Sequence, residues 1–273
     1  MSLRTKIVTT QKYNKLFKSF LDKPYPLALK NERQTLVYFG CIHTRDQKDG
    51  QYKQNKKLFS NFLELTKGKE RIVFVENYLP TLEKTELEMV KKHGFSGQNT
   101  WLANKQNIPV SCPEPEWEWI LEFTVKEIKD KTQIATWMFL NTLGRFVKNN
   151  SIEKENIKAI EGSLLYINKS LKTENVYDKI RKLLIGKPYK IKLDEDIKNI
   201  WKEQLDYQKI KNIQDPFITK TKLNKVGTVI NLARDTWIAN QILNSLSGGK
   251  SVFATFGLNH VLSQKKFFED YFK

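Results

Sequence analysis

The chain has 273 residues and a formal net charge of +17, and 40% of its residues are hydrophobic and 12% aromatic. This composition is too apolar for a disordered chain, and the length fits one large domain or one domain with an insertion. No apolar run approaches the roughly 20 residues that span a bilayer, and residues 1–10 lack the apolar core of a secretory signal. Two cysteines, Cys41 and Cys112, make no disulfide framework, so we expect a reduced, cytoplasmic protein.

Short apolar strands alternate with helical patterns in the first part of the chain. The pattern predicts strands at 35–39, 71–75 and 108–111 and helices at 52–66, 82–92 and 100–106, the last two separated by a break at Gly94–Gly97. This alternation is typical of a parallel sheet with helices on its faces.

From residue 117 to about 212 the patterns are helical only, with breaks at Asn149–Ser151 and Gly186–Pro188. We interpret residues 117–214 as a helical insertion in a single α/β domain that spans residues 1–273. The remaining elements are a long helix or a broken pair at 218–246, kinked if anywhere near Gly227, a strand at 251–256 and a closing helix at 260–272. The expected fold class is therefore α/β, a central and mainly parallel sheet flanked by helices, with the insertion between its third and last core strands.

The excess of positive charge comes mainly from lysine. Only 7 of the 47 basic residues are arginine, whereas recognition of phosphates and base edges favours the planar fork of arginine. The lysines are scattered along the chain and mixed with acids, which is typical of a solvated surface. We therefore expect nucleic acid not to be a partner. A polyanion-associated protein is kept as a third possibility on the charge alone, and the oligomeric state stays open.

Two of the three histidines end the same short sequence. FGCIH at residues 39–43 and FGLNH at residues 256–260 each follow a predicted strand, and a histidine follows Phe-Gly-x-x by chance only about once in 400. Because open α/β sheets bind ligands outside the carboxyl ends of their strands, we expect His43, Glu76 and His260 at one edge. There an imidazole can accept a proton from water or bind a metal, and a carboxylate can orient it. The alternative is that both histidines are structural residues near a helix N-cap.

These motifs, the strand-terminal Glu76 and the sequence LARD at residues 232–235 resemble the TraB/Tiki, erythromycin esterase and ChaN-like superfamily, in that family's order. The resemblance covers roughly residues 35–115 and 224–265. It implies that His43, Glu76, Arg234 and His260 share one cleft in a sheet flanked by helices. His43 would be a general base or metal ligand with Glu76 as its acidic partner, Arg234 would hold an anionic group or an oxyanion, and His260 would be the second base or ligand.

Members of that superfamily differ in what they do. Erythromycin esterases hydrolyse a lactone with an activated water and no required metal, Tiki-like members resemble metal-dependent proteases, and ChaN-like members bind haem. The resemblance therefore implies a hydrolase of an ester, lactone or amide, with a small-molecule or peptide substrate and a divalent metal as an optional cofactor on His43, Glu76 and His260. The alternative is a non-catalytic protein that binds haem or another small ligand in the same cleft. Residues 93–98, HGFSGQ, depart from relatives that carry a further glutamate there.

Other polar residues near the predicted strand ends have two interpretations each. Arg45 and Asp46 follow the first motif and either line the mouth of the cleft or pair with each other. Glu114 either binds substrate or lies in a solvated Pro-Glu-Pro-Glu turn. We interpret His93 as a partner of a helix C-terminus and Cys41 as an inert buried thiol. No zinc-type spacing, P-loop, G-x-G-x-x-G or G-x-S-x-G is present, so nucleotide binding and serine-hydrolase chemistry have no support.

Overall fold

The computed structural model describes residues 23–148, 151–216, 218 and 220–273, and the chain divides into two compact units. The first unit comprises Met1–Pro115 and Arg234–Lys273, and the second comprises Glu116–Ala233. Residues 1–10, in which we predict no secretory signal, lie outside the described residues. Residues 149 and 150 of the predicted break lie outside them as well.

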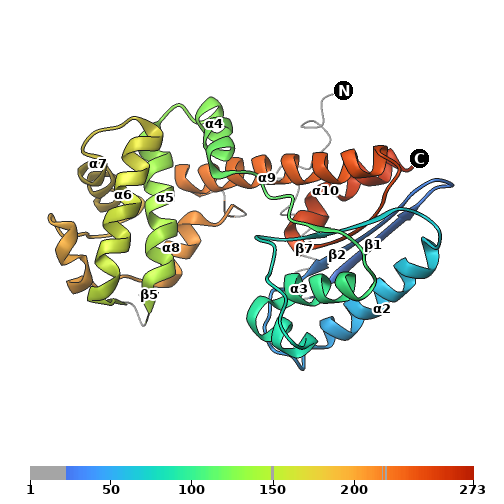
Figure 1. Ribbon diagram of the computed structural model, residues 1–273. Coiled ribbons are helices and arrows are strands. Elements are labelled where there is room, and N and C mark those ends of the chain that lie inside the picture. Colours follow the sequence, from blue (N-terminus) through green and yellow to red (C-terminus); the bar gives the residue numbers. More distant parts are fainter. Residues whose placement is uncertain (1–22, 149–150, 217, 219) are drawn as a thin grey trace. The chain divides into compact units, whose positions relative to one another are not determined.

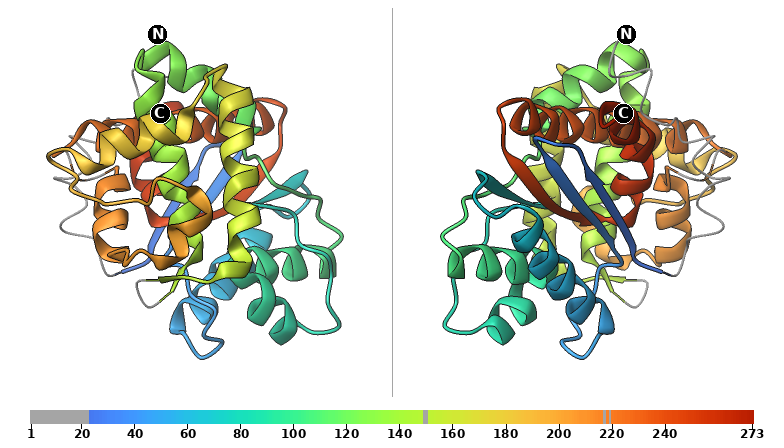
Figure 2. Two further views of the ribbon diagram at one scale, coloured as in Figure 1. Left: turned by 90° about the vertical axis from the view of Figure 1, so that its left-hand side faces the viewer. Right: turned by 90° about the vertical axis from the view of Figure 1, so that its right-hand side faces the viewer.

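The first unit is built on a five-stranded sheet with the order β1-β2-β7-β3-β4 (Figure 1). Its strands are β1 (Tyr25–Lys30), β2 (Thr35–Cys41), β3 (Arg71–Val75), β4 (Val110–Ser111) and β7 (Ser251–Gly257). β2, β7, β3 and β4 are parallel, and β1 joins β2 in the antiparallel sense. The α/β class with a mainly parallel sheet is thus confirmed. Figure 2 shows β1 and β2 beside the red strand β7.

Helices cover both faces of this sheet (Figure 1). They are α2 (Gly50–Leu65), α3 (Glu86–Lys105), the second half of α9 (Lys222–Ser247) and α10 (Leu258–Tyr271). Because successive side chains of a strand point to opposite faces, Val37 and Phe253 pack with Phe62 of α2 on one side. On the other side the ring of Tyr38 contacts Phe268 of α10. The strand ends are therefore held between two helical layers.

Helix α3 contains the break that the sequence predicts at Gly94–Gly97, but the break is confined to Gly94, where two helices meet at a kink. It is helical from Glu86 to Lys105 except at Gly94, where φ is 59° and ψ is −137°. Only glycine adopts this conformation at low cost. The bend therefore needs one residue, and helical backbone resumes at Phe95.

The second unit is helical and has its own apolar core, which includes Phe139, Leu140 and Ile160. Its elements are α4 (Trp117–Glu127), α5 (Lys131–Phe146), β5 (Val147–Lys148), β6 (Ser151–Ile152), η2 (Lys154–Asn156), α6 (Ile157–Leu171), α7 (Val176–Ile185), η3 (Ile197–Lys202), α8 (Tyr207–Gln214) and the first half of α9. The short antiparallel pair β5–β6 corrects the expectation of helices only. Two-residue strands carry no periodicity that a sequence pattern could show.

The second unit also extends beyond the expected end of the insertion at residue 214. α9 is one helix through Gly227 and not a broken pair, and its residues Leu223 and Ile230 belong to the core of the second unit. The boundary between the units therefore falls within α9, at Ala233 and Arg234.

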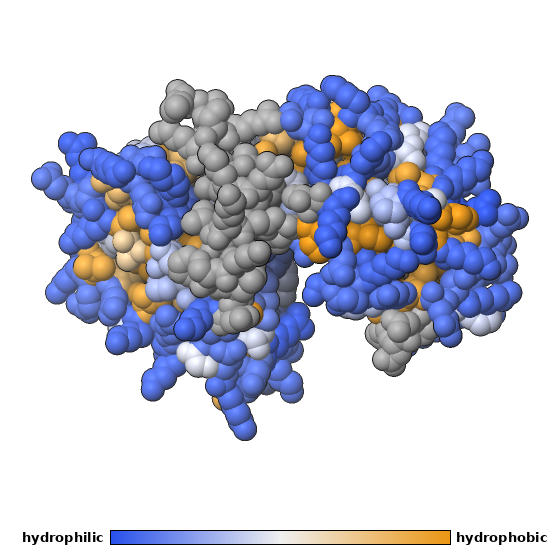
Figure 3. Space-filling view, turned by 180° about the vertical axis from the view of Figure 1, so that it is seen from behind, coloured by the Kyte–Doolittle hydropathy of each residue, from blue (hydrophilic) through white to orange (hydrophobic). Residues whose placement is uncertain are grey.

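Hydrophilic side chains dominate the face seen in Figure 3, which agrees with a lysine-rich, solvated surface. None of the helices that the structure describes combines the length and the apolar character needed to cross a bilayer.

The bend in α3 gives a prediction about stability. Gly94→Ala should lower the free energy of unfolding by about 1–3 kcal/mol, because an L side chain strains this backbone conformation. Urea unfolding followed by circular dichroism measures the change. Gly50→Ala, where an added Cβ meets nothing within 4 Å, is the matched control and should be as stable as the wild type or slightly more so. Equal stability of all three proteins would show that Gly94 does not set the bend.

Candidate functional site

The ends of β2, β3 and β7 bring the two G-x-x-H motifs beside Glu76. In the parallel ladder Cys41 lies opposite Gly257, and Val75 lies opposite Thr255. The residues that follow these strands therefore leave the sheet at one edge, as the sequence pattern predicts.

The glycine of each motif makes room for the other motif. A Cβ added at Gly257 would lie 2.9 Å from Nε2 of His43, and one added at Gly40 would lie 3.1 Å from Cα of Leu258. A side chain at either position would displace the His43 ring or the first turn of α10. The repeated glycine thus has a packing reason at both positions.

Glu76 lies at the centre of a cluster that it forms with His43, His260 and Arg234. Glu76 is 6% exposed. Its Oε2 accepts a 2.6 Å hydrogen bond from the N–H of Gly257 and lies 3.2 Å from Nε2 of His43. Its Oε1 lies 3.5 Å from Nε2 of His260 and 3.6 Å from Nη2 of Arg234. Burial alone would raise the pKa of Glu76, but the hydrogen bonds and charges of His260 and His43 hold this pKa well below its usual value. Glu76 is therefore ionised.

His260 is buried between two carboxylates. Its Nδ1 lies 2.6 Å from Oδ1 of Asp235, and its Nε2 faces Glu76. Burial lowers the pKa of His260, but the charge and hydrogen bond of Asp235, aided by Glu76, more than offset it and raise the pKa to about 9. His260 is therefore protonated near neutral pH, which does not fit its predicted role as a second base and suits a residue that compensates the charge of Glu76.

Asp235 is a member of the cluster that sequence reasoning missed. Besides His260, its Oδ1 accepts a 3.0 Å hydrogen bond from Nε2 of Gln264. The available signal was an acid beside Arg234 within an apolar stretch of helix, since such an acid needs a buried partner.

Arg234 and Glu114 form a bidentate ion pair. Nε of Arg234 lies 3.1 Å from Oε2 of Glu114, and Nη2 lies 2.8 Å from Oε1. Burial works against the charge of Arg234, but Glu114 outweighs this effect and raises the pKa of the guanidinium further. These two residues, expected to hold an oxyanion and the substrate, bind each other, and Arg234 also contacts Glu76. Their contacts fit a positioning role better than direct substrate binding.

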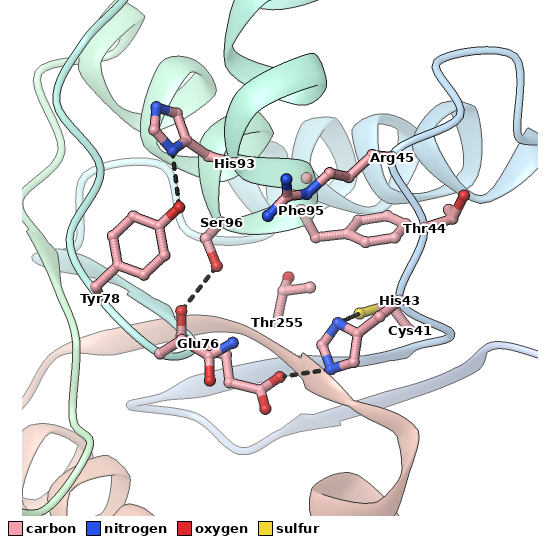
Figure 4. Close-up of a pocket in the computed structure, with 12 residues that line it drawn as sticks. Cys41, His43, Thr44, Arg45, Glu76, Tyr78, His93, Phe95, Ser96 and Thr255 are labelled. Atoms are coloured by element: carbon pink, nitrogen blue, oxygen red, sulfur yellow. Dashed lines mark hydrogen bonds and ion pairs between the residues drawn. The ribbon is translucent and has the colours of Figure 1, made fainter. Parts of the chain in front are cut away.

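A polar cavity of about 320 Å³ opens beside His43 and Glu76 (Figure 4). It is lined by Cys41, His43, Thr44, Arg45, Glu76, Asn77, Tyr78, His93, Gly94, Phe95, Ser96 and Thr255. His43 is the cluster member most open to it, with a side chain 60% exposed against 8% for Glu76. The exposed imidazole is therefore the group that a ligand in the cavity can reach.

Of the other residues singled out in the sequence, Arg45 and His93 line the cavity and Asp46 does not. Arg45 lines it, whereas the carboxylate of Asp46 accepts a 3.0 Å hydrogen bond from the N–H of Lys48 and is not part of the lining. His93 lies just before the Gly94 bend, as a helix-end residue would, but its Nδ1 is 2.8 Å from the hydroxyl of Tyr78.

Tyr78 and Ser96 are lining residues that sequence reasoning missed. The Ser96 hydroxyl donates a 2.9 Å hydrogen bond to the backbone carbonyl of Glu76, as Figure 4 shows. Ser96 reaches the cavity because of the bend at Gly94. The glycine indicated the bend, but nothing in the sequence showed its direction.

The contacts of His43 define its chemistry. The hydrogen bond with Glu76 raises its pKa above the ordinary value, although burial opposes this shift. Because Nε2 faces a carboxylate, the neutral ring keeps its proton there, and the lone pair lies on Nδ1, 3.9 Å from Sγ of Cys41. Burial raises the pKa of Cys41 well above its usual value, which agrees with the interpretation of this thiol as inert.

These donors do not fit the optional metal. Within the ranges that the structure describes, no group of three or more His, Cys, Asp or Glu side chains could hold a metal ion. Nε2 of His43 and Nε2 of His260 both face Glu76 and carry protons where a metal would need lone pairs. A haem iron would have to bind Nδ1 of His43, because Nε2 keeps its proton toward Glu76, and Nδ1 lies beside the Sγ of Cys41. We therefore derive no step through a metal or haem.

The close approach of Gly257 to His43 can be tested by nuclear magnetic resonance, since the chain has only three histidines. Gly257→Ala should push the ring from Glu76 and move the pKa of His43 down toward the ordinary value of about 6.5, because the Glu76 hydrogen bond raises it. Titration of the histidine Hε1 signals measures this, with Gly50→Ala as control. An unchanged pKa of His43 would contradict the assigned contact.

The buried His260 also makes stability depend on pH. Its pKa is about 6.5 in an unfolded chain and about 9 when folded, so its contribution is complete below pH 6.5 and is lost as the pH rises through 9. This contribution is on the order of 3 kcal/mol. The difference in unfolding free energy between the wild type and His260→Gln, measured in urea from pH 6 to pH 9.5, should shrink by that order. A constant difference would mean that His260 is not held protonated.

We compared the chain with protein families, curated proteins and solved structures. No protein-family model, no curated protein and no solved structure matches the chain. The resemblance to the TraB/Tiki, erythromycin esterase and ChaN-like superfamily therefore rests on the ordered motifs alone, and the activity that it implies stays a prediction.

Proposed function

We propose that this protein is a general acid–base hydrolase of an ester, lactone or amide, with a small-molecule or peptide substrate. In this proposal His43 transfers the proton and Glu76 orients it. The observation that carries it is the 3.2 Å contact between Nε2 of His43 and Oε2 of Glu76 at the wall of a polar cavity. We keep the predicted cytoplasmic location within this proposal, with Cys41 and Cys112 as free thiols.

The proposed reaction uses Nδ1 of His43, the ring nitrogen that does not face Glu76 and lies 3.9 Å from Sγ of Cys41. A water in the cavity gives a proton to Nδ1 while its oxygen attacks the substrate carbonyl. The proton on Nε2 stays in the hydrogen bond to Glu76, whose charge stabilises the imidazolium that forms. His43 then returns the proton to the leaving group, and the ring is ready for another cycle.

The inner residues support this role by keeping Glu76 ionised. Asp235 holds the proton on His260, and the imidazolium faces Oε1 of Glu76. Arg234 faces the same oxygen, and Glu114 fixes the guanidinium. A carboxylate with one oxygen so occupied presents the other to His43. We therefore assign these four residues to positioning.

The proposal predicts that His43→Gln lowers kcat/KM by about 100-fold or more. The fold should persist, since the side chain is 60% exposed. A panel of 4-nitrophenyl esters, simple lactones and fluorogenic peptides supplies the substrates, and circular dichroism checks folding. In the wild type kcat/KM should rise with pH through the raised pKa of His43, because only the neutral ring accepts a proton.

Arg33→Gln is a suitable control because Arg33 is exposed before the start of β2, whereas His43 follows the end of that strand. Equal turnover of every substrate by the wild type and by His43→Gln would exclude the hydrolase. Binding of panel compounds that depends on His43, with no turnover in any protein, would favour the non-catalytic alternative.

A further inference from the structure

The cavity beside His43 contains a positive charge that no residue described by the structure neutralises. Arg45 lines the cavity, and in Figure 4 its side chain extends across it toward Ser96. Within the described part of the chain, the Arg45 guanidinium makes no ion pair or side-chain hydrogen bond. Arg234, in contrast, is bound by two carboxylates. Arg45 is thus the arginine of this site that is available to a ligand.

The negative charges near the cavity are already occupied. Among the described residues that line the cavity, Glu76 is the only acid, and its oxygens face Gly257, His43, His260 and Arg234.

Two acids of the loop after β2 are also bound within that loop and its helix. Asp46 accepts a hydrogen bond from the N–H of Lys48, and Asp49 accepts one from the N–H of Gln51 at the start of α2. Neither acid lines the cavity, so the charged lining groups that remain open to a ligand are Arg45 and, when it is protonated, His43.

The polar groups around Arg45 suit an oxyanion. Four lining residues carry a hydroxyl, of which Ser96 and Thr255 already donate theirs to the carbonyl of Glu76 and to Asn55. The Thr44 hydroxyl only accepts a hydrogen bond, from the N–H of Asp46, so it can still donate to a carboxylate or phosphate oxygen. A guanidinium presents a planar fork that matches two oxygens of such a group. A volume of about 320 Å³ is at the small end of ligand pockets.

We propose that Arg45 binds a carboxylate or phosphate group of the ligand, and that the substrate carries this anionic group beside the bond cleaved at His43. The second part rests on the proposed hydrolase, whereas the first is a statement about binding alone. The net charge of +17 would speed the approach of such substrates from solution.

Binding is tested without turnover. Succinate and orthophosphate are titrated separately at constant ionic strength, and the Hε1 signal of His43 is followed. Saturable shifts are expected, and Arg45→Gln should raise Kd by about 10- to 100-fold, the range for a lost hydrogen bond to a charged group. Arg33→Gln removes the same charge from an exposed position before β2 and should leave Kd unchanged. The probe that binds more tightly identifies the carboxylate or the phosphate as the preferred group.

Turnover separates this inference from the proposed function. Monoethyl succinate and ethyl butyrate differ in their terminal charge, and Arg45→Gln should lower kcat/KM for the first ester only. Anion binding that depends on Arg45 without hydrolysis of any ester would keep the anion site and remove the hydrolase. Hydrolysis through His43 with no saturable anion binding would keep the hydrolase and overturn the anion site. An equal loss of anion binding in Arg33→Gln would also overturn it, because diffuse surface charge would then explain the binding.

Discussion

The carboxylate of Glu76 must remain charged in a buried position, and the rest of the site follows from this constraint. An ionised carboxylate taken out of water is costly unless hydrogen bonds and opposite charges compensate it. Here the compensation comes from the N–H of Gly257, from His43, from His260 and from Arg234. These groups belong to β7, the loop after β2, α10 and α9. Charge compensation therefore ties together segments that are distant in the sequence.

Burial gives the histidines of the two F-G-x-x-H motifs different surroundings. The side chain of His43 is 60% exposed and that of His260 is 7% exposed, although both face the same carboxylate. A second acid, Asp235, holds the proton on the buried ring, whereas Nδ1 of the exposed ring lies beside the Sγ of Cys41. A repeated sequence motif thus need not indicate a repeated role, and in the proposed reaction only one of the two histidines exchanges protons.

The apolar runs of the sequence predicted the positions of the buried strands, but the sequence did not show where the side chains of Asp235 and Ser96 point. The strands at 35–39, 71–75 and 251–256 lie within β2, β3 and β7, because short apolar runs rich in β-branched and aromatic residues are typical of buried strands. β1 escaped notice because Leu27 is its only buried residue. The strand ends located His43 and Glu76, but helix phase decides that Asp235 faces His260, and the backbone at Gly94 decides that Ser96 reaches the cavity. Neither leaves a periodic signal in one sequence.

The charges around Glu76 and His260 also explain why this cluster differs from a metal site built from the same residue types. Two imidazoles and a carboxylate can be balanced by a divalent cation or by protons. In this protein Asp235 favours the protonated form of His260, and Arg234 adds a fixed positive charge next to Glu76. A metal ion would have to displace the His260 proton and approach a guanidinium that Glu114 holds in place. The residues around the shared motif, and not the motif itself, thus favour a protonated His260 over a bound metal ion.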